Sequence, residues 1–274
     1  MITAKEIMTG KVITVTSGKG GVGKTTATAN IGAALAAMGN SVVCIDADIG
    51  LRNLDVVMGL ENRIVYDLVD VVEGRCKLRQ AMIRDKRLDG LYLIPAAQTR
   101  DKSAITPGDM KKVTAELRKD HDFILIDSPA GIERGFQNAI AAANEVVIVT
   151  NPEVSAVRDA DRIIGMVEAE QKGPAKLVIN RINMDMVAKG DMLSAGDVLE
   201  LLAVELIGIV PDDQAVLVST NRGSPIALEP KNKTGQAFRN IASRLTGEDV
   251  PFLATNGDKS FIGRISKLIR TGNT

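Results

Sequence analysis

This sequence contains few cysteines and carries no net charge. Only two cysteines, Cys44 and Cys76, occur among 274 residues. They are too few for a disulfide framework, and no C-x-x-C spacing offers a metal or iron–sulfur site. Lysine plus arginine equals aspartate plus glutamate, at 34 each, so no overall basic charge attracts the chain to nucleic acid. Any charge-based targeting must therefore be local.

Long apolar runs are also missing. No uninterrupted stretch of about 18 apolar residues is available to span a membrane. The first ten residues, MITAKEIMTG, lack the apolar core of a signal peptide. We therefore expect a reduced, cytoplasmic protein. Its length and its ordinary globular composition, 45% apolar and 25% charged, allow one large α/β domain or two small ones.

A glycine-rich stretch at residues 17–26, SGKGGVGKTT, organises the chain. It follows an apolar run at 12–15 and precedes an alanine-rich segment at 27–38, so its context is strand, loop, helix. From Gly18 to Thr25 the spacing matches the phosphate-binding loop GxxxxGK[ST]. Glycines let consecutive backbone N–H groups face one anion, and the following helix presents its positive end to the same anion. The alternative is an ordinary glycine turn.

The residue types in this loop predict ATP and Mg²⁺ as ligands. We expect Lys24 to reach the β- and γ-phosphates and the Thr25 hydroxyl to complete a Mg²⁺ shell. The expected nucleotide-binding residues of the loop are Gly18, Lys19, Gly20, Gly21, Val22, Gly23, Lys24, Thr25 and Thr26.

Apolar strand patterns alternate with helical patterns along the rest of the chain. After the loop and its helix, strand patterns occur at residues 41–48, 91–96, 123–126, 145–150, 176–179 and 206–210. Such alternation predicts an α/β fold: a doubly wound, mostly parallel sheet with helices on both faces. Cys44 lies within one of these runs, and we expect it to be a small buried hydrophobe. Ligands of such folds bind at the carboxyl ends of the strands.

Carboxylates stand at two of these strand ends. Asp127 ends the apolar run 123–126, where nucleotide hydrolases place a carboxylate near Mg²⁺; a helix cap or turn residue is the alternative. Asp46 and Asp48 end the run 41–48. Residues i and i+2 of a strand share a face, so both carboxylates could approach the γ-phosphate.

The extra lysine of the loop, Lys19, connects the chain to a known family. The segment KGGVGKTT at 19–26 resembles the deviant phosphate-binding loop (deviant Walker A) of the ATPases that include MinD, ParA, the nitrogenase iron protein and ArsA. The resemblance covers essentially the whole chain and is to the MinD branch, through DADIGLRNLD at 46–55, DSPAGIE at 127–133 and NPEVSAVRDADR at 151–162.

The resemblance implies how these residues act. Lys19 is expected to cross a dimer interface to the other subunit's phosphates, so that ATP holds two copies together; the alternative is a solvated loop lysine. Asp48 is implied to orient or activate the attacking water near Mg²⁺, with Asp46 as the second candidate. Asn53 is implied to help hold the partner. The residues implied to act in catalysis are Lys19, Lys24 and Asp48, and those implied to lie near the metal are Thr25, Asp48 and Asp127.

Two later segments are expected to bind the adenine. Asn180 and Arg181 follow one strand pattern, and Pro211 and Asp213 follow the last. An amide at a strand end can pair with the adenine amino group and a ring nitrogen. Relatives use these positions for the base, but an asparagine that ends a strand in a turn is the alternative.

The segment at 151–162 is expected to open a helix that Ser155 caps. Asp159 and Asp161 lie on it, and in the MinD branch this helix forms part of the surface for which partner proteins compete. Both aspartates are therefore candidate partner-binding residues. The alternative is a solvated amphipathic face.

The tail predicts a membrane-binding element. We expect an ATPase domain at 1–245, a flexible linker at 246–259 and an amphipathic helix at 260–270. On a helical projection the apolar residues of that helix form an arc about 120° wide, and no acidic residue occurs in it. Such a basic amphipathic helix suits an anionic membrane surface, and docking on the core is the alternative. The expected membrane residues are Phe261, Ile262, Arg264, Ile265, Lys267, Leu268 and Ile269.

Together these features predict an ATP-dependent, dimerising ATPase that cycles on the inner face of the cell membrane. The resemblance implies a role in placing the division septum, with a division inhibitor similar to MinC and an ATPase-stimulating protein similar to MinE as partners, and no nucleic acid. A ParA-like DNA partition ATPase is the alternative, although it should carry a basic surface. A redox relative would need bridging cysteines. A nucleotide-gated scaffold without hydrolysis also remains open.

Overall fold

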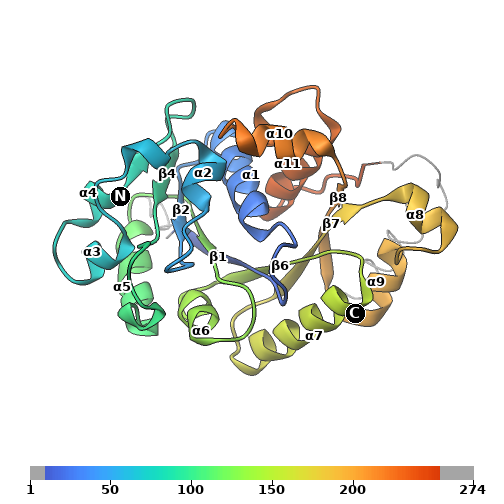
Figure 1. Ribbon diagram of the computed structural model, residues 1–274, viewed down its shortest axis with the longest axis horizontal. Coiled ribbons are helices and arrows are strands. Elements are labelled where there is room, and N and C mark those ends of the chain that lie inside the picture. Colours follow the sequence, from blue (N-terminus) through green and yellow to red (C-terminus); the bar gives the residue numbers. More distant parts are fainter. Residues whose placement is uncertain (1–9, 254–274) are drawn as a thin grey trace, which may run out of the picture.

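The expected apolar runs form one sheet of eight strands in the computed structural model, which describes residues 10–253. The strand order is β3-β4-β2-β5-β1-β6-β7-β8 (Figure 1). In chain order the strands are β1 (Lys11–Thr16), β2 (Val42–Asp46), β3 (Ile83–Arg84), β4 (Leu91–Ile94), β5 (Phe123–Asp127), β6 (Glu145–Thr150), β7 (Ala175–Ile182) and β8 (Glu205–Pro211). Every neighbouring pair is parallel except β3 with β4. The expected α/β fold with a mostly parallel sheet is confirmed.

The first strand lies in the middle of the sheet. β1 pairs with β5 on one side and with β6 on the other. β2 pairs with the far side of β5, and their last residues, Asp46 and Asp127, lie opposite each other. The carboxyl ends of β1, β2 and β5 therefore meet at one edge, where the phosphate-binding loop begins.

Helices cover both faces of this sheet. They are α1 (Lys24–Ala37), α2 (Leu54–Met58), α3 (Leu68–Val72), α4 (Leu78–Ala81), α5 (Pro107–Leu117), α6 (Arg134–Ile140), α7 (Val154–Ala169), α8 (Met184–Lys189), α9 (Ala195–Leu202), α10 (Gln214–Asn221) and α11 (Lys233–Leu245). α1, α10 and α11 lie on one side, and α5, α6 and α7 lie on the other (Figure 1). Within residues 10–253, no helix combines the length and apolar character needed to cross a bilayer.

The strands are apolar throughout because both faces are covered. In β5, Phe123 and Leu125 pack into a cluster with α1 and α11, whereas Ile124 and Ile126 pack into another with α5. A third cluster joins α6, α7 and α9 to β6, β7 and β8. Alternate side chains of one strand thus enter different layers, and no face is left for water.

Helix α1 packs very closely on the central strands. A Cβ at Gly32 would lie 2.5 Å from the sulfur of Cys44, so only glycine fits there. Cys44 is fully buried, as expected, and burial raises the pKa of its thiol well above the usual range. It is a packing residue of the core.

The chain after α11 stays fastened to the core for several residues. The Arg244 guanidinium donates to the carbonyl oxygens of Ile207 and Val250, at 2.8 and 2.7 Å. It also lies 3.9 Å above the ring of Phe252, which packs against the cluster of α7 and α9. The first part of the expected linker, residues 246–253, is therefore not free of the core. Its remainder and the expected amphipathic helix at 260–270 lie outside the described residues.

Candidate nucleotide-binding site

The loop between β1 and α1 is built to face an anion. Gly21 and Gly23 adopt left-handed backbone conformations, with φ of 78° and 94°. A Cβ at Gly20 or Gly21 would meet no atom within 4 Å, so the loop is open on one side. On its other side, a Cβ at Gly18 would lie 2.3 Å from the backbone of α7, so this glycine is needed for close packing. The loop is thus held by α7 and leaves its open side to a ligand.

A pocket of about 430 Å³ lies against this loop. Its walls come from the loop, the start of α1, the segment after β2 and the segment after β5. The lining residues include Gly20, Gly21, Gly23, Lys24, Thr25, Thr26, Asp48, Asn53, Pro129 and Arg181. The expected phosphate-binding residues Lys19, Lys24, Thr25 and Thr26 all reach it, whereas Val22 is buried beneath the loop.

Lys24 is held from below by a buried carboxylate. Its ammonium nitrogen lies 3.4 Å from Oδ1 of Asp127, and Thr28 donates to the same oxygen at 3.2 Å. Asp127 therefore lies under the loop, with 1% of its surface exposed, and is not among the residues that line the pocket. Its expected place near Mg²⁺ is thus one layer beneath Thr25. Thr28, one helical turn after Lys24, had not been predicted.

Asp46 and Asp48 do not share a strand face, contrary to our expectation. β2 ends at Asp46, and Asp48 lies in the following turn. The Asp46 carboxylate turns back and accepts the backbone N–H groups of Asp48, Asn53 and Leu54, at 3.0 to 3.1 Å. Asp46 is 1% exposed, so it shapes the segment that carries Asp48 and is not available to water at the γ-phosphate. Asp48 alone of the pair lines the phosphate pocket.

The carboxylates of Asp46 and Asp127 lie on paired residues of neighbouring strands and are both buried, so ionising both at once costs free energy. Burial, with the nearby Asp127 charge, raises the pKa of Asp46 to about 7, although three backbone N–H groups oppose the shift. Burial also raises the pKa of Asp127, against the opposing effects of Lys24, Thr25 and Thr28. The edge where β2 and β5 end therefore binds a proton readily.

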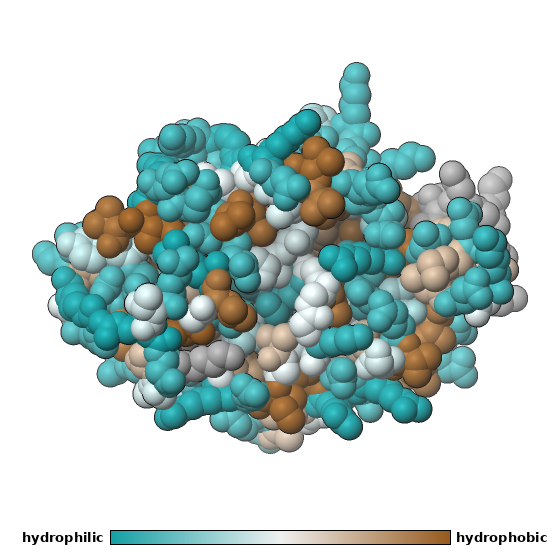
Figure 2. Space-filling model, in the orientation of Figure 1, coloured by the Kyte–Doolittle hydropathy of each residue, from teal (hydrophilic) through white to brown (hydrophobic). Residues whose placement is uncertain are grey.

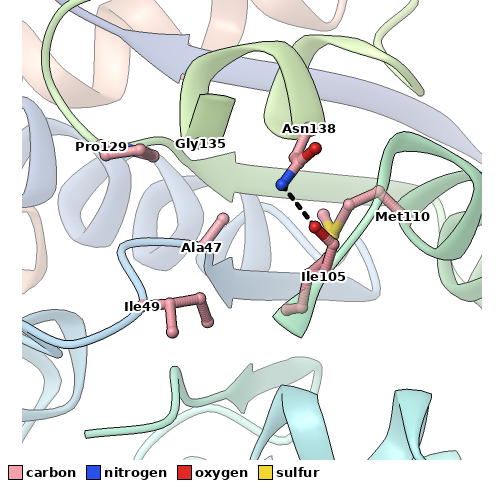
Figure 3. Close-up of a pocket in the computed structure, with 7 residues that line it drawn as sticks. All are labelled: Ala47, Ile49, Ile105, Met110, Pro129, Gly135 and Asn138. Atoms are coloured by element: carbon pink, nitrogen blue, oxygen red, sulfur yellow. Dashed lines mark hydrogen bonds between the residues drawn. The ribbon is translucent and has the colours of Figure 1, made fainter. Parts of the chain in front are cut away.

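A small apolar cavity separates the segments that follow β2 and β5. It has a volume of about 10 Å³ and is lined by Ala47, Ile49, Ile105, Met110, Pro129, Gly135 and Asn138 (Figure 3). Asn138 donates to the carbonyl oxygen of Ile105 at 2.8 Å. Asp48 lines the phosphate pocket, while its neighbours Ala47 and Ile49 line this cavity. The segment is therefore fixed by packing on the side away from the phosphates.

Lys19 lies at the mouth of the pocket. Its ammonium nitrogen is 3.3 Å from Oγ of Ser155 and 3.6 Å from a Glu153 oxygen at the start of α7. Its side chain is 45% exposed. Ser155 does not cap α7, contrary to our expectation: the cap position is Glu153, and the Ser155 hydroxyl meets Lys19.

A second pocket adjoins the first and holds the expected adenine-binding residues. It measures about 390 Å³, and Asn180, Arg181, Pro211 and Asp213 line it. Gly23, Thr26 and Arg181 line both pockets, so the two spaces are continuous. Arg181 has a left-handed backbone, with φ of 57°, at an irregular end of β7. The structure thus brings together the loop and the two distant segments expected to bind the base.

Two of these residues also have structural partners. Asn180 donates to the carbonyl oxygen of Val22 at 2.8 Å and so ties β7 to the phosphate loop. Asp213 caps α10, since it accepts the Ala215 N–H at 2.8 Å and the Thr234 hydroxyl at 2.7 Å. Burial raises the pKa of Asp213, but the hydrogen bonds to its carboxylate lower it by more, so the net shift is downward.

The candidate partner residues lie on α7. Asp161 is exposed, and Asp159 is half-buried where α7 meets Gly18. Arg162 lies 3.9 Å from Asp159. The helix that carries them therefore touches the phosphate loop directly.

Two ion pairs near the site had not been predicted. Arg52 has a φ of 35° and lies 2.9 Å from the buried carboxylate of Asp55. Arg87 pairs with the buried Asp85 and donates at 2.7 Å to the carbonyls of Met58 and Gly223, which end α2 and follow α10. Asp55 stands in an apolar stretch of the sequence, and that was the available signal, whereas Asp85 is flanked by charged residues and gave none.

The donors present fit a magnesium nucleotide. Thr25 presents a hydroxyl and Lys24 an ammonium group to a pocket bounded by open glycines. Oδ1 of Asp48 is buried and has no hydrogen-bond partner among residues 10–253. A buried carboxylate oxygen without a donor is suited to a water molecule that a bound cation or phosphate orders.

Comparisons with known proteins agree with this geometry. The profile of the "CobQ/CobB/MinD/ParA nucleotide binding domain" family matches residues 13–226. The septum site-determining protein MinD of Bacillus subtilis is 55% identical over 244 residues, which are 88% of this chain and 91% of the relative. The chain of the MinC:MinD cell division protein complex of Aquifex aeolicus superposes with a TM-score of 0.83 at 49% identity, over 90% of this chain and all of that one.

A further solved structure contains a bound nucleotide. The septum site-determining protein MinD of Pyrococcus horikoshii, complexed with Mg-ADP, superposes with a TM-score of 0.77 at 30% identity, over 86% of this chain and 95% of that one. The family profile, the sequence relatives and the superposed structures all match this chain, and they confirm the family that the deviant phosphate-binding loop predicted. This chain belongs to the MinD/ParA family of nucleotide-binding ATPases.

Proposed function

We propose that this chain is an ATP-driven, dimerising and membrane-cycling ATPase that places the division septum. The observation that carries the proposal is the different placement of the two loop lysines. Lys24 is buried and paired within its own chain, whereas Lys19 stands half-exposed at the mouth of the same pocket. A lysine in that position is available to the phosphates of a second chain. The identity to MinD proteins supports the same biological role.

The residues of the pocket divide the work of hydrolysis. Lys24 and the loop N–H groups neutralise the β- and γ-phosphates, and Mg²⁺, when bound beside Thr25, neutralises charge that develops in the transition state. Asp48 places the attacking water, while Asp46 holds the segment that carries Asp48. Lys19 of a second chain completes the charge, so hydrolysis requires the dimer. The isolated chain therefore turns over slowly.

Dimerisation also controls how tightly the protein binds to the membrane. A single tail at 260–270 has five apolar residues and binds weakly, because burial must offset the ordering of an eleven-residue helix. Two tails on one dimer gain roughly 10²- to 10⁴-fold in avidity. ATP binding thus places the dimer on the inner face of the membrane, and hydrolysis returns monomers to the cytoplasm.

Partner proteins bind the dimer through α7. Asp159 and Asp161 offer them negative charge beside the phosphate loop. The similarity to the MinC:MinD cell division protein complex of Aquifex aeolicus supports a MinC-like division inhibitor as one partner. A MinE-like protein that stimulates hydrolysis is the other. DNA partition is the less favoured function, since the chain carries no net charge.

The test is co-sedimentation with anionic liposomes in ADP and in ATP. It compares the full chain with a chain that ends at Lys259, and Lys19→Ala with Lys112→Ala, whose ammonium is exposed elsewhere. We expect pelleting only in ATP and only with the tail, and its loss in Lys19→Ala alone. Pelleting in ADP, or without the tail, would reject the membrane switch. Salt-dependent binding to DNA would favour partition instead.

A further inference from the structure

The largest groove near the start of α7 is mixed in chemistry and has no assigned role. It measures about 600 Å³ and lies between the start of α7, helix α8 and the start of α9. Its apolar walls are Val154, Met186, Val187, Met192 and Leu193. Val154 is 57% exposed and Met186 is 40% exposed. Apolar surface among polar side chains is visible beside α8 (Figure 2). Exposed apolar side chains around one groove indicate a docking surface.

The rim of the groove is acidic. Glu153, Asp191 and Asp197 line it, and all three are exposed. Glu153 has Lys19 at 3.6 Å. Within residues 10–253, neither Asp191 nor Asp197 has a lysine or arginine within 4 Å. The groove therefore suits a ligand with an apolar stripe and positive charge beside it.

The chain itself carries such a segment. Residues 260–270 contain five apolar residues and the cations Arg264, Lys267 and Arg270, with no acidic residue. The described chain ends at Leu253, next to Phe252, which packs on the same apolar cluster as Val187, Met192 and Leu193. Six residues, 254–259, separate Leu253 from Ser260, and the seven steps between those two Cα atoms can span up to roughly 25 Å. This reach exceeds the radius of gyration of about 18 Å expected for a domain of this size.

We propose that residues 260–270 dock into this groove of their own chain when the protein is monomeric. The inference rests on the proposed membrane role of the tail, because docking hides the same apolar residues that would enter the bilayer. A second chain that approaches Lys19 must also approach Glu153 and Val154 at the rim. Dimerisation and docking therefore compete, and the dimer exposes tails that the monomer holds back.

Methionine methyl NMR tests the docking directly. The full chain and the chain ending at Lys259 are compared with ADP bound. We expect the Met186 and Met192 methyl resonances to differ between them, and those of the fully buried Met58 and Met110 to coincide. A peptide of residues 260–270 added to the shortened chain should restore the first two shifts. The same peptide with Arg264→Glu, Lys267→Glu and Arg270→Glu should not.

A variant gives the functional consequence. Met186→Glu should release the tail and raise pelleting of the ADP-bound chain on anionic liposomes about three- to tenfold. Leu201→Glu, at an exposed apolar position outside the groove, should leave pelleting unchanged.

The outcomes separate this inference from the proposed function. Identical Met186 and Met192 resonances in both chains would overturn the docking, even if ATP still drives tail-dependent pelleting. Differences that grow with protein concentration would also overturn it, because they would indicate docking between chains. Loss of all pelleting with the NMR differences intact would reject the membrane role and leave the docking in place.

Discussion

The ammonium nitrogen of Lys24 lies 3.4 Å from Oδ1 of Asp127, and less than a tenth of either side chain is exposed. The lysine is therefore oriented by its own chain before any phosphate arrives. Asp127→Ala should leave a buried cation without its partner and lower the free energy of unfolding by about 3–5 kcal/mol. Urea denaturation measures this change. Asp89→Ala, which removes an exposed partner of Arg84, should cost less than about 1 kcal/mol, and equal costs would contradict the assignment.

Gly23 combines a left-handed backbone with a close neighbour. Its φ is 94°, and a Cβ would lie 2.2 Å from the amide nitrogen of Asn180. Gly23→Ala should weaken ATP binding at least about tenfold, because left-handed strain alone costs about 1–2 kcal/mol. Isothermal titration calorimetry with Mg-ATP gives the affinity. Gly165→Ala, at an open position on α7, should bind ATP normally, and normal binding by both variants would refute the proposed loop geometry.

Substitutions of Asp46 and Asp48 should have different effects, the first on stability and the second on hydrolysis. Asp46→Ala removes the acceptor of three backbone N–H groups and should destabilise the protein by about 3 kcal/mol. Asp48→Asn should change stability by less than about 0.5 kcal/mol but lower stimulated hydrolysis by at least about 10²-fold. Thermal unfolding and phosphate release measure the two effects. Unchanged hydrolysis in Asp48→Asn would remove it from the reaction.

His121 should make stability depend on pH below neutrality. Its Nδ1 lies 2.7 Å from Oγ of Ser41, and its ring meets Tyr92 edge to face. Burial lowers its pKa below the usual 6.5, although Asp120 and Asp122 oppose the shift. On acidification the unfolded chain therefore protonates His121 at a higher pH than the folded chain does. The contribution of His121 to the free energy of unfolding is fully present above pH 6.5 and is lost as the pH falls toward the folded pKa.

Since this is the single histidine, its NMR titration reports that pKa without overlap. We expect a midpoint below 6.5 and, relative to His121→Gln, a loss of thermal stability on acidification from about pH 7 to 5. In His121→Gln this part of the pH dependence should be absent. A midpoint above 6.5 would contradict the burial argument.

The parts of the fold that sequence predicted are those where one physical signal dominates. Strands buried on both faces are apolar throughout, so the position of every strand except β3 could be predicted. The glycine loop could be predicted because few residue types allow its backbone. The two-residue strand β3 was missed, since Ile83 and Arg84 are too few to form a pattern. The base side was predicted through family resemblance, and the structure brings its residues to one pocket.

The errors in the site have a common cause. Ser155 and Asp46 were assigned by residue type and spacing, but their partners come from distant segments. Ser155 meets Lys19, which is 136 residues away, and the turn after β2 decides where the Asp46 carboxylate points. Thr28 and Arg87 were missed for the same reason, because the carboxylates they serve lie far along the chain or in an unpredicted turn.

The central place of β1 has a consequence during synthesis on the ribosome. Lys11 pairs with Phe123, 112 residues later, and Ile13 pairs with Glu145, 132 residues later. At about 5–20 residues per second, β1 waits roughly 6–20 s for its first neighbour to be made. Its apolar residues are exposed to chaperones for that time. The phosphate-binding loop that follows β1 is thus translated well before the strands that hold β1 in place.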